Sequence, residues 1–314
     1  MFWRGKHTFA DLHANTTDIG AYPPPQLTYF VSGSSGSDNN TGLGGWGNAK
    51  ETFQAGITAA ISADNCYRDV DLIVGPWEYD EEAEVGALTT ARQASSGDTW
   101  LGYKIGRLRI ICMGKAVVFK NSTAKTGHTL NVLRMKTEIY GGTWRNYTAT
   151  TTMAQPAAIH FERINTGDYG DVINAKLIGA KIEGRATVAK STIGVDVDAA
   201  QYVWIERCVI SGWDTGILVA ANGLGNPIEN VIRDCYFRGN TNDVELGGSQ
   251  FTLIEDCKFV DDGATTFISA SDWSTRIAAN TDCCVVGCVF NYSGFPSGNL
   301  TTGVDYMDSH VNDV

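Results

Sequence analysis

The chain has 314 residues and a formal net charge of −11, from 24 Lys and Arg residues against 35 Asp and Glu residues. This acidic balance, without any cluster of Lys or Arg, excludes binding to a phosphate backbone as the main role, so we expect no nucleic acid partner. No apolar run approaches the roughly 20 residues that span a bilayer, and the start lacks the apolar core of a signal peptide, so we expect no membrane insertion and no export by the usual route.

Residues 1–27 stand apart from the rest of the chain. They begin with aromatic and basic side chains and end in the sequence YPPP, which forms a stiff, extended spacer. We interpret them as an attachment arm, and a disordered terminus or an additional capping strand is the alternative. The arm residues that we expect to make contacts are Phe2, Trp3, Arg4, Lys6 and His7.

Residues 28–85 are expected to contain a strand followed by a capping helix. Between about Lys50 and Ser62, the apolar side chains of Phe53, Ile57 and Ala60 fall on one face of a helix. A helix that covers the first strands would keep their edges from pairing with other chains.

A repeat fills residues 86–306 and leaves a tail at 307–314. Its unit reads aliphatic-x-x-small-x-large apolar, and successive small positions lie 22–38 residues apart, which is typical of a solenoid. Two apolar residues three apart would face opposite sides of a flat strand, so we place a sharp corner between them. The residue before the small position suits a left-handed backbone in most copies: it is Gly141, Gly179, Asp234, Asp256 and Gly287, with Arg207 and Met113 as exceptions.

A second alternating strand follows each corner, which makes three short strands in each coil. The sequence therefore predicts an all-β fold, a right-handed parallel β-helix of about seven coils with an N-terminal capping helix. Four small positions of the repeat are cysteines, and we expect them to form a buried structural ladder. They are Cys208, Cys235, Cys257 and Cys288. Because the eight cysteines include no CxxC pair, we expect no metal site and no cofactor.

Three motifs near the start add a resemblance to a known family. The stretches YFVSGSSGSDNNTG, AKETFQAGITAA and DLIVGPWEYDEE resemble the beginning of pectin-lyase-like β-helix proteins. The resemblance implies a helix lying across the open end of the β-helix, and it says little about activity. Such domains occur in secreted polysaccharide lyases and hydrolases, in bacterial surface proteins, and in phage tailspikes and related virion proteins.

The outward positions of the second strand suggest one candidate site. We expect the first outward column to contain Asn131, His160, Asp196, Leu218, Glu245, Ile268 and Asp305. The next outward column begins with Glu162 and Asp198, so these two would lie beside His160 and Asp196. The candidate catalytic residues are His160, Glu162, Asp196, Asp198 and Glu245. Acid–base work on a glycosidic bond, a Ca²⁺ site and a solvated acidic face are the three alternatives for this patch.

Three tryptophans are candidates for contact with a glycan or with another subunit. Trp204 falls on the outward phase of its strand, while Trp213 and Trp273 are expected in turns. Flat aromatic rings of this kind can stack on sugars, and they are also common at subunit contacts.

The first functional hypothesis is a non-enzymatic viral structural protein of phage, tailspike-like, acting as a spike, tail or capsid-decoration component. It would be a homotrimer in the virion, assembled in the host cytoplasm, whose partners are other virion proteins and a host surface polysaccharide. The alternative is a polysaccharide lyase or glycoside hydrolase. A second alternative is a secreted bacterial surface protein, which would place the chain outside the cell or on its surface.

Overall fold

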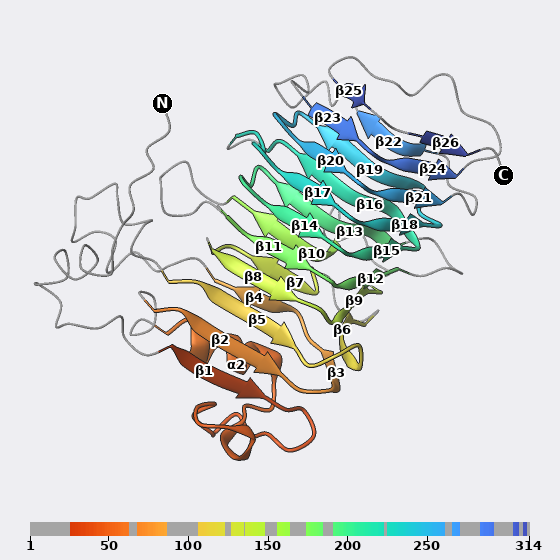
Figure 1. Cartoon of the computed structure of the whole chain (residues 1–314). Helices are drawn as coiled ribbons and strands as arrows, with labels where there is room; N and C mark the ends of the chain where they lie inside the picture. Colours follow the sequence, from red (N-terminus) through yellow and green to blue (C-terminus); the bar gives the residue numbers. More distant parts are fainter. Residues whose placement is uncertain are drawn as a thin grey trace, which may run out of the picture.

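The computed structural model describes residues 26–62, 68–86, 106–122, 127–134, 136–147, 156–163, 174–184, 191–222, 225–260, 266–270, 283–291, 304–307 and 310–312. In this part of the chain the strands form three parallel sheets, and successive coils stack along one axis (Figure 1). The fold is a right-handed parallel β-helix, as the sequence predicts. No helix among the described residues is long and apolar enough to cross a membrane.

In the described part of the chain, seven coils contribute one strand to each sheet, and further strands extend sheet A and sheet B at the ends. Sheet A comprises β1 (Leu27–Val31), β2 (Val70–Val74), β5 (Leu108–Cys112), β8 (Thr137–Tyr140), β11 (Lys176–Ile178), β14 (Trp204–Glu206), β17 (Val231–Arg233), β20 (Leu253–Glu255), β23 (Cys283–Val286) and β25 (Val304–Met307). Sheet B comprises β3 (Trp77–Asp80), β6 (Val117–Asn121), β9 (Thr143–Asn146), β12 (Lys181–Glu183), β15 (Val209–Ser211), β18 (Tyr236–Arg238), β21 (Lys258–Val260), β24 (Val289–Asn291) and β26 (His310–Asn312). Sheet C comprises β4 (Ala83–Val85), β7 (Leu130–Val132), β10 (Ala157–Glu162), β13 (Ser191–Asp198), β16 (Trp213–Ala220), β19 (Asn242–Gly247) and β22 (Thr266–Ala270).

The corner between sheet A and sheet B has the left-handed backbone that the repeat predicts. The residue before the small position has a positive φ in six successive coils, and these residues are Gly141, Gly179, Arg207, Asp234, Asp256 and Gly287. Arg207, expected as an exception, adopts the same conformation with a φ of 54°. In the earlier coil the positive φ falls on Gly114 and not on Met113. The corner turns both flanking apolar residues inward, which explains the spacing of the repeat.

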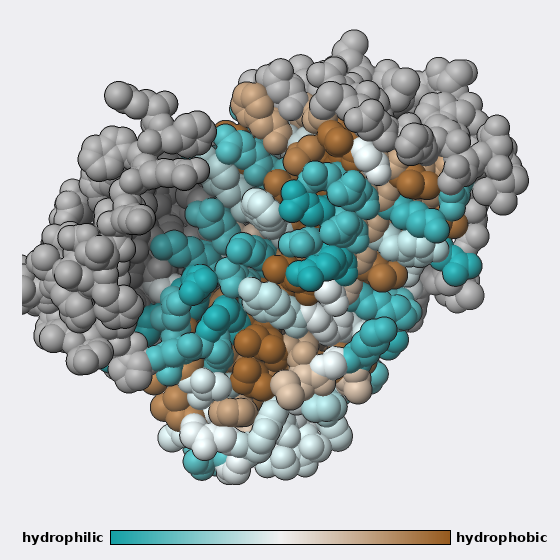
Figure 2. Space-filling model, viewed as in Figure 1, coloured by the Kyte–Doolittle hydropathy of each residue, from teal (hydrophilic) through white to brown (hydrophobic). Residues whose placement is uncertain are grey.

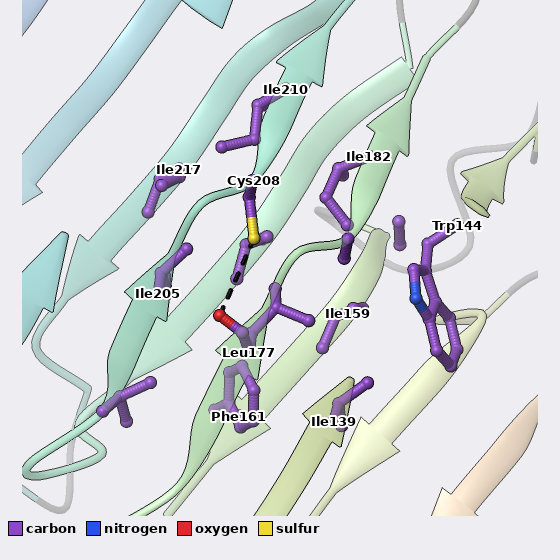
Figure 3. Packing of buried hydrophobic residues seen from close by; sticks show 14 of the residues in the cluster. Ile139, Trp144, Ile159, Phe161, Leu177, Ile182, Ile205, Cys208, Ile210 and Ile217 are labelled. Carbon is purple, nitrogen blue, oxygen red and sulfur yellow. Dashed lines mark hydrogen bonds between the residues drawn. The ribbon is translucent and has the colours of Figure 1, made fainter. Parts of the chain in front are cut away.

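The core is built from columns of equivalent residues, one from each coil. Phe237, Phe259 and Phe290 stack with ring centroids 4.8 Å apart and nearly parallel planes. The cysteines of the ladder are also buried, at 1% exposure or less. The thiol of Cys208 donates to the carbonyl oxygen of Leu177 one coil earlier, at 3.7 Å, and the later cysteines repeat this bond (Figure 3). A cysteine at this position therefore fills the crowded corner and also finds an acceptor for its S–H group.

A short helix lies against the first strands of the β-helix. Helix α2 (Phe53–Ala60) buries Phe53, Ile57 and Ala60, on the face that the sequence predicts. Two acidic side chains hold its first turn: Glu81 accepts hydrogen bonds from the backbone N–H groups of Phe53 and Gln54, and Asp38 accepts from that of Thr52. The helix follows a 3-10 turn, η1 (Trp46–Asn48).

Substitutions at the corner residue Gly179 test whether the corner requires a left-handed backbone. A β-carbon on Gly179 would meet no heavy atom of the described residues within 4 Å, so only the φ of +66° opposes a side chain there. We expect Gly179→Ala to lower the free energy of unfolding by about 1–2 kcal/mol, the cost of a left-handed conformation. Gly179→Asn should cost less, because Asn tolerates this region better. Urea unfolding measures both, and equal stability of Gly179→Ala and the parent would contradict the corner.

Candidate active site on the outer face of sheet C

The outer face of sheet C brings a histidine and three carboxylates together. Strands β10 and β13 pair in register, so His160 lies opposite Asp196 and Glu162 lies opposite Asp198. The outward phase of these strands follows from the inward phase of Ile159, Phe161 and their partners in the core. We call His160, Glu162, Asp196 and Asp198 the acid–histidine cluster.

The contacts in the acid–histidine cluster involve both ring nitrogens of the histidine. His160 Nε2 lies 3.6 Å from Asp196 Oδ2 and 3.9 Å from Asp198 Oδ2. His160 Nδ1 lies 3.9 Å from Glu162 Oε2. Because both Asp oxygens lie within 3.9 Å of one nitrogen, the two carboxyl groups are close enough to each other to share acid–base work.

The acid–histidine cluster is more buried than a solvated face would be. His160 is 6% exposed and Asp196 is 7% exposed, although both point away from the core of the β-helix. Within the described part of the chain, His160 Nδ1 and Asp198 Oδ1 are buried and have no hydrogen-bond partner. Buried polar atoms of this kind are costly for folding, so they are typical of sites that serve a function.

A second histidine lies against the first. His128 precedes β7, and its ring stacks on that of His160 with centroids 4.1 Å apart and planes 28° from parallel. Its Nδ1 accepts a hydrogen bond of 3.0 Å from the backbone N–H of Ala157, so the proton of the neutral ring is on Nε2. A neutral ring beside His160 avoids a second positive charge in the same buried place.

The surroundings of the two histidines shift their pKa values in opposite directions. Burial, followed by the charge of His160, lowers the pKa of His128 to about 3. Burial also acts to lower the pKa of His160, but Asp196, Asp198 and Glu162 outweigh it and hold that pKa above its usual value. His160 is therefore the positively charged member of the stacked pair near neutral pH.

Not every residue of the expected outward column belongs to the site. Glu245 is in the column, but Leu218 separates it from Asp196, and its Oε2 accepts from the hydroxyl of Thr215 at 3.2 Å. The expectation for Ile268 was wrong, because Ile268 pairs with Val244 in the core and Ser269 takes the outward position. Asp305 was also misplaced, because β25 belongs to sheet A, where Asp305 pairs with Cys284.

The structure separates the three tryptophans. Trp204 is 37% exposed on the outer face of sheet A, and the guanidinium of Arg233 lies 5.8 Å from its ring centroid. The contact role expected for Trp213 was wrong, since this residue opens β16, is fully buried and donates from its indole N–H to the carbonyl oxygen of Ile182. Trp273 and the arm residues Phe2, Trp3, Arg4, Lys6 and His7 lie outside the described residues.

Sequence reasoning missed His128 and the exposed acid Glu84. His128 lies just before its strand, where the alternation of the repeat does not define which side a residue faces. Glu84 belongs to the outward column, opposite Asn131, but its strand comes before the first clear copy of the repeat. Among the described residues, no group of three or more His, Cys, Asp or Glu side chains could hold a metal ion.

The comparisons with known proteins show the fold. No protein-family model and no curated protein sequence matches the chain. Its structure is similar to that of the pectin methylesterase from Aspergillus niger, with a TM-score of 0.54 and 13% identity over 93% of this chain and 87% of that one. A rice weevil pectin methyl esterase gives 0.54 and 12% over 97% and 94%, and one from Yersinia enterocolitica gives 0.53 and 10% over 83% and 90%.

These similarities correct the functional hypothesis made from sequence. The chain has the pectin-lyase-like parallel β-helix fold, as the N-terminal motifs imply. The hypothesis of a non-enzymatic viral structural protein was wrong, because the solved structures to which this chain is similar are pectin methylesterases. Nothing supports the tailspike, capsid, trimer or virion assignments that accompanied it.

Proposed function

We propose that this protein is a polysaccharide-active enzyme that cleaves its substrate at the acid–histidine cluster. The observation that carries the proposal is the position of His160, buried on an outward face within 3.9 Å of three carboxylates. A face that only kept the molecule soluble would leave these groups in water. General acid–base catalysis, in contrast, needs charged groups with shifted pKa values at close range.

The members of the cluster have different roles in this proposal. The imidazolium of His160 donates a proton to the oxygen of the departing sugar. Asp198, whose side chain is 20% exposed, accepts a proton from the attacking group, and Asp196 holds the imidazolium in its charged form. His128 supports the ring of His160 from the side.

The substrate class is supported by the proteins of the same fold. The structures reported above are pectin methylesterases, and pectin is a polysaccharide. At 10–13% identity these proteins share the fold with this chain and do not define its bond specificity. Most structural polysaccharides lie outside cells, so we also propose that the protein works as a secreted or cell-surface enzyme.

A screen against soluble polysaccharides tests the proposal. The purified chain and its His160→Gln variant are incubated with plant, algal and bacterial polysaccharides, and new chain ends are measured by a reducing-sugar assay and by mass spectrometry of the products. We expect cleavage of at least one polymer by the parent and a loss of about 10²–10⁴-fold in the variant. Equal cleavage by both proteins, or no cleavage of any polymer, would contradict the proposal.

A further inference from the structure

The three sheets differ in how they carry positive charge. Every Lys or Arg that lies within a described strand is on sheet A or sheet B, and these residues are Arg109, Lys120, Arg145, Lys176, Lys181, Arg233, Arg238 and Lys258. The described strands of sheet C contain neither Lys nor Arg. They contain acids instead, namely Glu84, Glu162, Asp196, Asp198, Asp214, Asp243 and Glu245. The face that carries the candidate site is therefore the acidic face.

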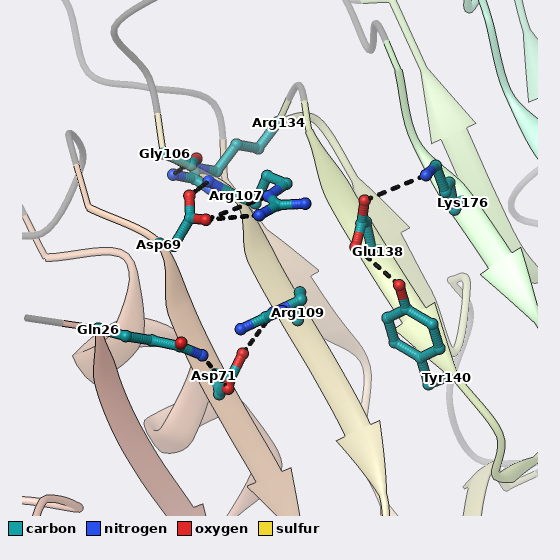
Figure 4. A network of polar contacts seen from close by, with 10 residues as sticks. All are labelled: Gln26, Asp69, Asp71, Gly106, Arg107, Arg109, Arg134, Glu138, Tyr140 and Lys176. Carbon is teal, nitrogen blue, oxygen red and sulfur yellow. Dashed lines mark hydrogen bonds and ion pairs between the residues drawn. The ribbon is translucent and has the colours of Figure 1, made fainter. Parts of the chain in front are cut away.

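The cations on the other sheets are largely matched by acids. On the outer face of sheet A, Arg109 pairs with Asp71 at 2.6 Å and Lys176 pairs with Glu138 at 3.4 Å (Figure 4). On sheet B, Arg145 pairs with Glu183 at 2.7 Å. The side of the molecule seen in Figure 1 accordingly has a mainly hydrophilic surface broken by small hydrophobic areas (Figure 2). The described strands of sheet C have no Lys or Arg to match their acids in this way, and His160 is their one candidate cation.

Two further acids of sheet C, Glu84 and Glu245, lie in the outward column of the candidate site. Glu84 and Asn131 precede His160 in the outward column, and Leu218 and Glu245 follow Asp196. Neighbouring coils are about 4.8 Å apart, so these carboxylates lie within or near one Debye length of the site at ordinary salt. The single imidazolium of His160 faces three of them, so the site retains a negative field.

The site favours a ligand that donates hydrogen bonds, because the Asp198 carboxylate, whose side chain is 20% exposed, can only accept them. Asp198 Oδ1 is a buried carboxylate oxygen without a partner among the described residues, and a carboxylate can only accept. Asn131 Oδ1, in the same column as His160, is likewise buried and has no partner there. Sugar hydroxyl and amino groups donate hydrogen bonds, whereas the carboxylate of a uronic acid or a sulfate group only accepts and would be repelled.

We infer that the substrate of this site is a neutral or amino-sugar polysaccharide, without carboxylate or sulfate groups on the sugars that contact sheet C. This inference rests on the proposed function. It also selects the reaction, because cleavage by elimination removes the proton beside a carboxyl group, which such sugars lack. The reaction is then hydrolysis: His160 protonates the glycosidic oxygen as the bond to the anomeric carbon breaks. Water adds to that carbon and loses a proton to Asp198, and proton exchange with solvent restores both groups.

The test compares polymers that share a backbone and differ in charge. Hydroxyethyl cellulose is matched with carboxymethyl cellulose, and methyl-esterified polygalacturonate is matched with polygalacturonate. Binding is measured by affinity electrophoresis and cleavage by new chain ends, with a chelator present so that no divalent cation bridges the charges. We expect the neutral member of a pair to be favoured by about tenfold or more at low salt, since every ~1.4 kcal/mol of repulsion is one factor of ten. The preference should shrink as salt is added.

A charge reversal beside the site provides the matched control. Glu84→Lys replaces an exposed acid of the outward column, so it should reduce the preference for the neutral polymer several-fold. Glu206→Lys makes the same change on β14 of sheet A and should leave the preference unchanged. A preference for the charged member at low salt would overturn the inference and leave the proposed function standing. Failure to bind or cleave any polymer in either test would remove both.

Discussion

Replacing Asp196 with Asn is expected to reduce kcat/KM by about 10²–10⁴-fold while the protein remains folded. The substitution keeps the size of the side chain and removes the charge that lies 3.6 Å from His160 Nε2. Without that charge the burial of His160 weighs more, so the pKa of His160 falls and less of the imidazolium donor is present near neutral pH. Initial rates on the best substrate, measured across a range of pH, report both the loss and its cause.

The matched control is Asp214→Asn, the same chemical change at an exposed position of β16. We expect this variant to stay within about twofold of the parent, as surface substitutions away from a site usually do. In Asp196→Asn the limb of the pH profile that reports the proton donor should move to lower pH. A large loss in both variants, or full activity of Asp196→Asn, would contradict the assignment of the site.

The stacked histidines should give the protein a stability maximum near neutral pH. His128 has a folded-state pKa of about 3, below its unfolded value, so its contribution is complete above about pH 6.5 and is lost as pH falls toward 3. His160 has a raised pKa, so its contribution is complete below about pH 6.5 and is lost as pH rises through the folded value. Each proton changes stability by about 1.4 kcal/mol per pH unit, so the acid limb amounts to roughly 5 kcal/mol.

Urea unfolding at a series of pH values measures these two limbs, and single replacements separate them. His128→Phe keeps a ring against His160 and removes the group that must stay neutral, so the slope between pH 3 and 6.5 should fall by one proton. This variant should also be less stable at neutral pH by about 1–3 kcal/mol, because the N–H of Ala157 loses its acceptor. His160→Gln should remove the alkaline limb and also shorten the acid limb, because the charge of His160 contributes to lowering the pKa of His128. Unchanged slopes in both variants would show that the stacked pair is not protonated as described.

The architecture could be predicted because it depends on local chemistry that repeats. Each corner requires a residue with a left-handed backbone conformation before the small residue. Gly179, Asp234 and Gly287 meet this requirement in separate coils. Coils with the same requirement must stack in register, so one correct corner defines three sheets. Even Arg207, a poor residue for this conformation, follows its neighbours, because the stacked coils on either side impose the geometry.

The candidate site could be predicted only in the middle of the β-helix. His160 and Asp196 lie on adjacent strands with clear alternation, so their pairing follows from the pattern. Toward the end of the chain the pattern is ambiguous, because Phe267 and Ile268 are both apolar and the alternation does not choose between them. The segment with Asp305 alternates equally well in sheet A or sheet C. The burial of Trp213 could not be predicted from the sequence either, since it depends on how one large ring packs among its neighbours in the adjacent coil.

Substrate is expected to bind on the outer face of sheet C, at the acid–histidine cluster. A crystal structure of Asp196→Asn with an oligosaccharide from the best substrate tests this expectation most directly, because the variant should bind sugar without cleaving it. We predict sugar rings against β10 and β13, with a glycosidic oxygen near His160 and hydroxyl groups donating to Asp198. Sugar bound only on sheet A, beside the exposed Trp204, with the face of sheet C empty, would contradict the account.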